Sequence, residues 1–259
     1  MLGGAESRGH HLQMMLQLLL LGVSFQTPRF LGAQDLLYVA SQEAVTVSVI
    51  DTRNNELLET VDLKTLGFSE SAKAHHTAVE PDGSFWYVSL ISAGKILKFD
   101  RQNRLVAQSS FEAPGMLSLD PTSDRLYVGR SMAAVNPPQR IGVIQRSSME
   151  IEEIDVFFPR PHALAVDPHG ERFFTASLGQ NSVAYGSLGV EEVDLFNIDG
   201  TTHTLVQFAL SPNGDWMVAG GQVSGELLIF DLSTWQPTLV KSVPVGGQPW
   251  HPSFSSDGT

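Results

Sequence analysis

Residues 74–83 read "AHHTAVEPDG", and this stretch decides the fold because it recurs along the chain. Close copies follow at 161–170 ("PHALAVDPHG") and 205–214 ("LVQFALSPNG"), and looser copies lie at 115–124 and 249–258. The residues at the turn position are, in order, Pro81, Pro121, Pro168, Pro212 and Ser256. They are spaced by 40, 47, 44 and 44 residues. A period in the forties, with strand-like segments throughout, predicts a β-propeller.

Each repeat contains four segments that suit four antiparallel strands. An alternating run such as "TAVEP" leads into a Pro-x-Gly turn, in which proline fixes φ and glycine accepts a positive φ. Segments rich in aromatic and β-branched residues follow, such as "SFWYVSL" (84–90) and "KILKFD" (95–100). A more polar run closes the unit. The sequence therefore predicts an all-β fold, a β-propeller of four-stranded antiparallel blades, with about five blades visible within residues 35–259.

The repeat is incomplete at both ends of this range. The first unit begins at Leu37 without an opening strand, and the last copy stops just after its turn. A propeller closes by joining its first and last blades, which hides the edge strands. We therefore expect a C-terminally truncated propeller whose parent has six to eight blades, with seven as the expected number.

The first 34 residues differ from the repeats in composition. Residues 14–25 ("MMLQLLLLGVSF") form an apolar run, preceded by Arg8 and followed by small residues near Ala33. Such a run is short for a membrane span and typical of a secretory signal peptide. Residues 1–34 are therefore predicted to be a signal peptide, and the protein is predicted to be secreted or periplasmic, without stable membrane insertion. An uncleaved anchor is the alternative.

The composition makes some classes of binding partner unexpected and excludes some kinds of covalent, metal-binding and catalytic site. The formal net charge is −12, and an acidic surface repels phosphate backbones, so nucleic acid is not expected as a partner. The chain contains no cysteine, which excludes disulfides, thiolate metal ligands and a cysteine nucleophile. Histidine is therefore the main nitrogen or sulfur donor that this sequence could offer to a transition metal.

The motifs of the repeat resemble a known family. Residues 36–63 ("LLYVASQEAVTVSVIDTRNNELLETVDL") and 245–258 ("VGGQPWHPSFSSDG") are similar to the YVTN-type β-propeller repeat. The resemblance implies a secreted or periplasmic propeller, and it leaves the function open because one propeller scaffold hosts many activities. Nitrous oxide reductase, haem-containing nitrite reductase and lactonase-type propellers are more distant relatives that the resemblance suggests.

Five histidines stand at the entries to predicted inner strands. They are His75, His76, His162, His203 and His251. Counted back from the turn position, His75 and His162 share offset six, and His76 and His251 share offset five. Inner strands line the central channel, so side chains from four blades could meet at one of its mouths. In a regular strand, neighbouring residues point to opposite faces, so one member of the doublet is expected to point into the channel.

These histidines allow two interpretations. Imidazoles from several blades could bind a metal, with copper or iron as the expected cofactor, and nitrous oxide reductase provides a fold-level analogy. The other interpretation treats them as ordinary residues of the repeat, which pack between blades and bond to the backbone. Residues at equivalent places in a repeat converge by symmetry, whether or not they bind anything.

The expected function is that of a secreted or periplasmic binding scaffold. Such a propeller would bind a protein or small-molecule ligand at its channel face, without catalysis of its own. A metal-dependent redox propeller and a lactonase-like hydrolase are the alternatives. The third strands end at Asp51, Asp100 and Asp231, which are expected to accept hydrogen bonds in turns, and no catalytic residue is assigned.

Overall fold

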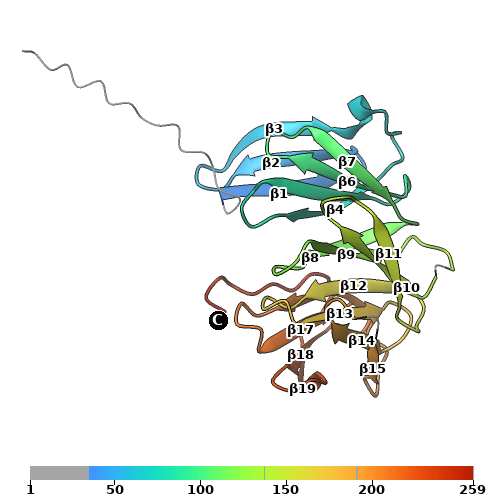
Figure 1. Ribbon diagram of the computed structural model, residues 1–259. Helices are drawn as coiled ribbons and strands as arrows, with labels where there is room; N and C mark the ends of the chain where they lie inside the picture. The colour runs from blue at the N-terminus through green and yellow to red at the C-terminus, as the bar shows by residue number, and fades with distance from the viewer. Residues whose placement is uncertain (1–34, 137, 191, 259) are drawn as a thin grey trace, which may run out of the picture. The chain divides into compact units, whose positions relative to one another are not determined.

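The structure is a computed structural model that describes residues 35–136, 138–190 and 192–258 (Figure 1). The described residues form no α-helix. In chain order the strands are β1 (Leu36–Ser41), β2 (Thr46–Asp51), β3 (Glu56–Asp62), β4 (Ala74–Val79), β5 (Phe85–Leu90), β6 (Lys95–Asp100), β7 (Leu105–Ser110), β8 (Pro114–Leu119), β9 (Arg125–Arg130), β10 (Arg140–Gln145), β11 (Ile151–Asp155), β12 (Pro161–Val166), β13 (Arg172–Ser177), β14 (Ser182–Ser187), β15 (Asp194–Asn197), β16 (Leu205–Leu210), β17 (Trp216–Gly221), β18 (Glu226–Asp231) and β19 (Thr238–Pro244).

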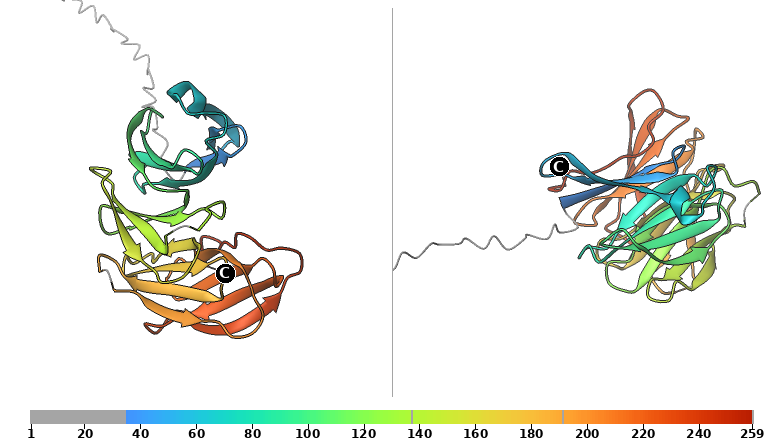
Figure 2. Two further views of the ribbon diagram at one scale, coloured as in Figure 1. Left: turned by 90° about the vertical axis from the view of Figure 1, so that its right-hand side faces the viewer. Right: turned by 90° about the horizontal axis from the view of Figure 1, so that it is seen from above.

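The strands form five antiparallel sheets that follow one another along the chain. Blade 1 is β1-β2-β3, and blades 2 to 5 take the next four strands each. The inner strands β4, β8, β12 and β16 lie side by side in chain order, and β1 lies beside β4. Figure 2 shows the blades from two further sides. The predicted β-propeller of four-stranded blades is confirmed, and in the described range blade 1 has three strands, as its missing opening strand predicted.

The repeated turns have the predicted backbone. Gly83, Gly170 and Gly214 have φ angles of 67°, 72° and 72°, a region that side chains with a Cβ rarely enter. The aspartates at the ends of the third strands also take their expected role. Asp100 accepts a hydrogen bond from the backbone N–H of Gln102 at 2.9 Å, and Asp231 accepts one from Ser233 at 2.7 Å.

Apolar side chains fill the spaces between neighbouring blades. Separate clusters join blades 1 and 2, 2 and 3, 3 and 4, and 4 and 5. In the first of them Trp86 is fully buried, and its ring stacks on Phe99 at 4.2 Å between centroids. The last strand of each blade is more polar and more exposed, as predicted, since it lies at the edge of its sheet; β3, β11 and β19 are examples. Each blade is therefore stabilised mainly by its neighbours.

Every four-stranded blade carries a β-bulge in its inner strand. Pairing with the second strand is interrupted between Ala74 and Thr77 in β4, and the corresponding interruption falls at the same place in β8, β12 and β16. His75, His76 and His162 lie within these bulges. A bulge breaks the alternation of side chains along a strand. The expectation that the two members of the doublet face opposite ways assumed a regular strand, and that assumption does not hold in β4.

In each four-stranded blade, a small residue in the second strand allows the following segment of the chain, at the inner edge of the next blade, to pack closely against it. Eight residues after the turn position stand Ser89, Gly129, Ala176 and Gly220. A Cβ on Gly129 would lie 2.9 Å from the carbonyl oxygen of His162, and one on Gly220 would lie 2.9 Å from the carbonyl oxygens of Pro249 and Trp250. Residues 249 and 250 thus take the place beside blade 5 that β12 takes beside blade 3, although residues 249–258 contain no assigned strand.

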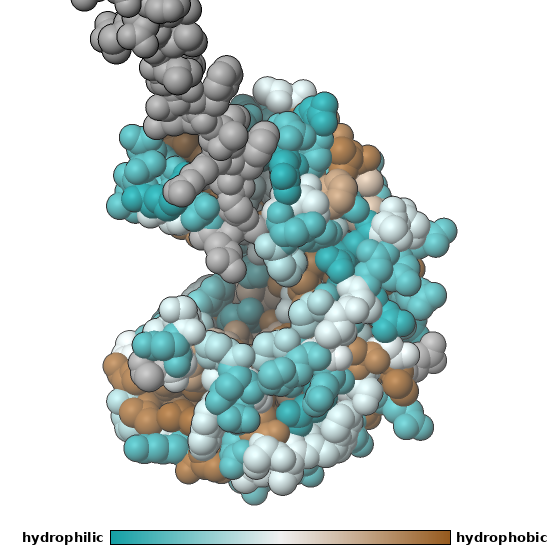
Figure 3. Space-filling model, turned by 60° about the vertical axis from the view of Figure 1, so that its left-hand side comes forward, coloured by the Kyte–Doolittle hydropathy of each residue, from teal (hydrophilic) through white to brown (hydrophobic). Residues whose placement is uncertain are grey.

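Some elements were not predicted individually. They are β14, β15 and a short 3-10 helix η2 (Leu63–Leu66) that follows β3. Within the described part of the chain, no helix has the length and apolar character needed to cross a membrane. Hydrophilic side chains cover most of the face shown in Figure 3, with hydrophobic residues in smaller patches. The predicted signal peptide, residues 1–34, lies outside the described residues.

Candidate functional site

Four of the five predicted histidines lie near one another, three of them at the beginnings of the inner strands β4 and β12 and His251 in a segment without an assigned strand. The rings of His75 in blade 2 and His162 in blade 4 lie 6.1 Å apart between centroids, in an edge-to-face arrangement. Electrostatic effects of His251 act on both of these rings and on His76. We call His75, His76, His162 and His251 the histidine cluster.

Blade 3 has a glycine where blades 2 and 4 have these two histidines. His75 and His162 occupy offset six in their repeats, and the equivalent residue in blade 3 is Gly115. A Cβ at this glycine would lie 2.7 Å from the backbone carbonyl carbon and oxygen of Arg130, so a side chain is sterically excluded. Blade 3 therefore contributes no side chain at this position, and the paired imidazoles come from blades 2 and 4, which are not adjacent.

The backbone of blade 5 fixes the tautomer of His162. The Nδ1 atom lies 2.7 Å from the carbonyl oxygen of Val206, and a carbonyl only accepts, so Nδ1 donates the proton. The Nε2 atom of the neutral ring then carries a lone pair. That atom is buried and has no hydrogen-bond partner among the described residues, in a side chain that is 1% exposed.

His76 is held in the opposite tautomer. The backbone N–H of Leu117, in blade 3, donates to His76 Nδ1 at 3.2 Å, so the proton of the neutral ring lies on Nε2. The backbone N–H of His76 donates to Ser89 Oγ at 3.2 Å, and Ser89 Oγ donates to the carbonyl oxygen of Gly115 at 2.7 Å. These bonds connect the bulge of blade 2 to blade 3.

The ring of His75 is the less constrained member of the pair. The residue is half-buried, yet its Nε2 atom is buried and has no hydrogen-bond partner in the described part of the chain. Buried polar atoms in folded proteins nearly always have a partner, so an unpartnered one calls for an explanation. His75 and His162 place two such atoms on neighbouring rings.

The cluster is neutral at physiological pH. Burial first, and then the neighbouring imidazoles, lower the pKa of His76 to about 3. Burial also lowers the pKa of His162 to about 4, against the opposing effect of its bond to Val206. The pKa values of His75 and His251 are lowered too, by burial first. Neutral imidazoles offer lone pairs and N–H donors, whereas they do not attract anions by charge.

The structure places His203 apart from this cluster. Its Nδ1 lies 2.9 Å from Ser224 Oγ and 3.5 Å from Glu226 Oε2, both in blade 5. Its backbone N–H donates to Asn181 Oδ1 at 2.9 Å. The position of His203 in an entry loop suggested convergence with the others, but its polar partners are local to blades 4 and 5.

Within residues 35–136, 138–190 and 192–258, no group of three or more histidine, cysteine, aspartate or glutamate side chains is arranged to hold a metal ion. The interpretation that these histidines bond to the backbone agrees with the contacts of His76 and His162. The same contacts leave the Nε2 atoms of His75 and His162 without partners. The hydrogen bonds therefore account for Nδ1 of the His162 ring, whereas its Nε2 has no partner among the described residues.

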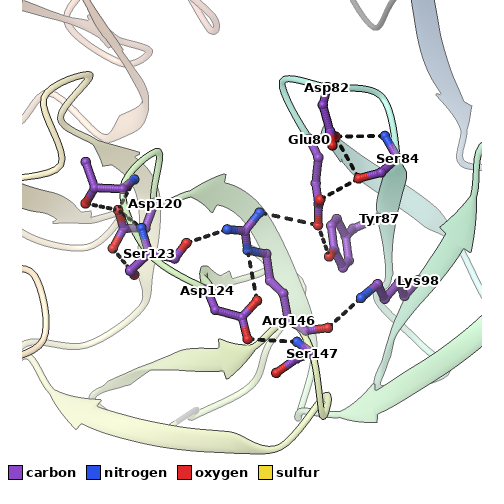
Figure 4. Close-up of polar contacts among 11 residues, drawn as sticks. Glu80, Asp82, Ser84, Tyr87, Lys98, Asp120, Ser123, Asp124, Arg146 and Ser147 are labelled. Atoms are coloured by element: carbon purple, nitrogen blue, oxygen red, sulfur yellow. Dashed lines mark hydrogen bonds and ion pairs between the residues drawn. The ribbon is translucent and has the colours of Figure 1, made fainter.

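A second polar cluster, which the repeat pattern did not predict, lies at the other end of β4. Glu80 accepts a hydrogen bond from Tyr87 at 2.6 Å and pairs with Arg146 at 3.3 Å (Figure 4). Lys98 donates to the carbonyl oxygen of Arg146 at 2.6 Å, and Asp124 lies 3.8 Å from Arg146 Nε. These contacts join blades 2 and 3, so this cluster is a structural connection between them.

A sequence signal for this second cluster does exist. The residue before each turn proline is an acceptor in the turn, and in blades 3 and 4 it is Asp120 and Asp167. Blade 2 has the longer Glu80 at this position, and its carboxylate reaches Ser84 at 2.9 Å as well as the neighbouring blade. A glutamate in place of the usual aspartate thus marks the blade with the extra connection.

Comparison with solved structures agrees with the β-propeller fold, and no comparison identifies a family for this chain. No protein-family model matches the sequence, and no curated protein matches it. Among solved structures, Kuenenia stuttgartiensis hydrazine synthase aligns with a TM-score of 0.52 and 16% identity, over 86% of this chain and 87% of that one.

Staphylococcus aureus virginiamycin B lyase is also similar. A catalytically inactive histidine-to-alanine variant with quinupristin aligns with a TM-score of 0.67 and 11% identity, over 83% of this chain and 68% of that one. Its selenomethionine form gives a TM-score of 0.65 and 11% identity, over 82% and 69%. Identities this low show a shared fold and no more.

Proposed function

We propose that the protein is a secreted or periplasmic propeller that binds a ligand at its histidine cluster. One observation carries the proposal: the buried Nε2 of His162, which has no hydrogen-bond partner among the described residues. Leaving a buried polar atom unpaired costs free energy, of the order of 1–3 kcal/mol. A bound ligand that uses this lone pair would recover that cost.

The geometry around this atom supports binding by a preorganised site. The tautomers of His76 and His162 are fixed by backbone groups of the following blades, so one ring presents a donor and the other an acceptor. Each ring sits on a rigid strand between packed blades. Side chains that are already ordered lose little conformational entropy on binding, which favours affinity.

The structural neighbours and the sequence add context to this proposal. One neighbour, virginiamycin B lyase, is described as catalytically inactive once a histidine is replaced by alanine, which is consistent with histidine as a functional group on this fold. The apolar run at residues 14–25 and the YVTN-like motifs support secretion, and the net charge of −12 disfavours nucleic acid. A small molecule or ion is the expected ligand, since the unpartnered atoms are single buried nitrogens.

A thermal-shift assay on the tag-free full chain tests this proposal. The panel consists of ZnCl2, NiCl2, MgCl2, sodium phosphate, N-acetylglucosamine, a γ-lactone and quinupristin. At least one probe should raise the melting temperature of the wild type and of His203→Gln, and should have a smaller effect on His75→Gln and His162→Gln. If no probe acts on the wild type, or if all four proteins respond equally, the histidine cluster is not a binding site for these ligand classes and the proposal is wrong.

A further inference from the structure

We infer that His75 and His162 hold one divalent transition-metal ion through their Nε2 atoms. The inference rests on the proposed function, because it names the ligand of the same cluster. It is carried by two rings from different blades whose centroids lie 6.1 Å apart and whose Nε2 atoms are both buried without a partner among the described residues. A single ion between the rings would satisfy both atoms at once.

The distance between the rings suits a shared ion. Imidazole nitrogens lie about 2.0–2.1 Å from zinc, so the centres of two rings on one ion lie roughly 5–6.5 Å apart, depending on the angle at the metal. The observed separation of 6.1 Å falls in this range. Blade 3, which lies between blades 2 and 4, has Gly115 at the equivalent position and adds no third side chain there.

The hydrogen bonds around His162 match those of a metal ligand. Metal-binding histidines commonly donate their other ring N–H to a backbone carbonyl or a carboxylate, which fixes the tautomer and orients the ring. His162 Nδ1 donates to the carbonyl oxygen of Val206 at 2.7 Å. His75 has no such bond, and either of its nitrogens can carry the proton, so metal binding would select the tautomer with its proton on Nδ1.

The donor set selects the class of metal. Two neutral imidazoles suit zinc, copper, nickel or iron, whereas magnesium and calcium prefer oxygen ligands. Two protein ligands leave further coordination positions for water or for a bound molecule. His76 has its neutral-ring proton on Nε2, so it remains a hydrogen-bond donor in the same cluster and is not counted as a ligand.

Copper(II) titration with electron paramagnetic resonance tests this inference. The protein is the tag-free full chain with His10→Gln and His11→Gln, so that only the histidines of the described range remain. One equivalent of CuSO4 should give a spectrum with coupling to two imidazole nitrogens. His75→Gln and His162→Gln should each bind copper at least about tenfold more weakly and lose one coupled nitrogen. Zinc should compete for the site, and magnesium should not.

His203→Gln is the matched control, because it removes another buried histidine that lies outside the cluster. It should bind copper with the affinity and spectrum of the parent. If His162→Gln fails to fold, the half-buried His75→Gln still decides the question. Unchanged copper binding in His75→Gln overturns the inference. If copper does not bind while another probe of the thermal-shift panel acts through His75 and His162, the metal assignment falls and the proposed function stands.

Discussion

The ring of His162 is buried in its neutral form, and this has a measurable effect on stability. Its pKa in the folded protein is about 4, lowered by burial, whereas a histidine in an unfolded chain titrates near 6.5. Between these values the unfolded state binds more protons, so the free energy of unfolding falls as the pH falls. The stabilisation is complete above about pH 6.5 and is lost progressively towards pH 4.

Urea denaturation of the metal-free protein at pH 7.5 and pH 5 measures this effect. The wild type should lose stability between the two values, and His162→Gln should lose clearly less, since glutamine does not titrate. An identical loss in wild type and His162→Gln would contradict the prediction.

At the scale of the strands, the close contact between β9 and β12 positions the histidine cluster. A Cβ on Gly129 would lie 2.9 Å from the carbonyl oxygen of His162, and backbone atoms on both sides cannot move aside easily. Gly129→Ala should therefore destabilise the protein by about 1–3 kcal/mol, the usual cost of overpacking. It should also weaken ligand binding, since β12 carries His162. Chemical denaturation and the thermal-shift assay measure the two effects.

Gly179→Ala provides the matched control for this prediction. Its added Cβ would have Ser177 Oγ as a neighbour at 3.9 Å, an ordinary contact, and the residue does not have a positive φ. This variant should retain both stability and binding. Equal losses of stability and of ligand binding in the two variants would show that the short contact between Gly129 and His162 determines neither property.

The strands also show how far the sequence could predict this structure. The Pro-x-Gly turns and the alternating runs predicted most strands, because the turn residues and the hydrophobic pattern are local properties. The bulges were not predicted, since they depend on the second strand of the same blade, where the small residues Ser89 and Gly129 lie opposite the bulged residues. The regular alternation assumed for His75 and His76 failed for this reason.

The candidate site was predictable in its residues and not in its geometry. Offsets from the turn identified His75 and His162 as equivalent positions. The 6.1 Å separation of their rings joins two blades that are not adjacent, and His203 instead contacts Ser224 and Glu226. These relations join residues far apart in the chain, so the repeat pattern alone did not reveal them.

At the scale of the whole molecule, stability is shared between neighbouring blades. Trp86 stacks on Phe99, contacts Tyr38 of blade 1 at 5.0 Å between ring centroids, and donates from Nε1 to Asn103 at 3.0 Å. Trp86→Ala should cost about 3–5 kcal/mol, as for other buried aromatic residues. In a protein whose repeats contact only their neighbours, a substitution destabilises mainly its own repeat and the adjacent ones. Hydrogen exchange should therefore increase most in blades 1 and 2, and least in blade 5.

Trp235→Ala is the corresponding control at the other end of the described chain. Trp235 is 47% exposed and donates to Asp194 at 2.6 Å, so its loss should cost less and should affect blades 4 and 5. Uniform loss of protection across all blades in Trp86→Ala would instead indicate a single cooperative unit and would contradict the predicted local response.

The bulges of the inner strands have a consequence for how such a protein can diversify. Residues in a bulge lie outside the regular ladder, so exchanging their side chains changes the local chemistry while the pairing on either side is retained. The equivalent positions hold His75, His162 and Val206 in blades 2, 4 and 5, although the turns that follow them stay alike, whereas Gly115 in blade 3 leaves no room for a side chain. A duplicated repeat with room for a side chain there thus adds one position at which evolution or protein engineering can alter recognition without redesigning the blade.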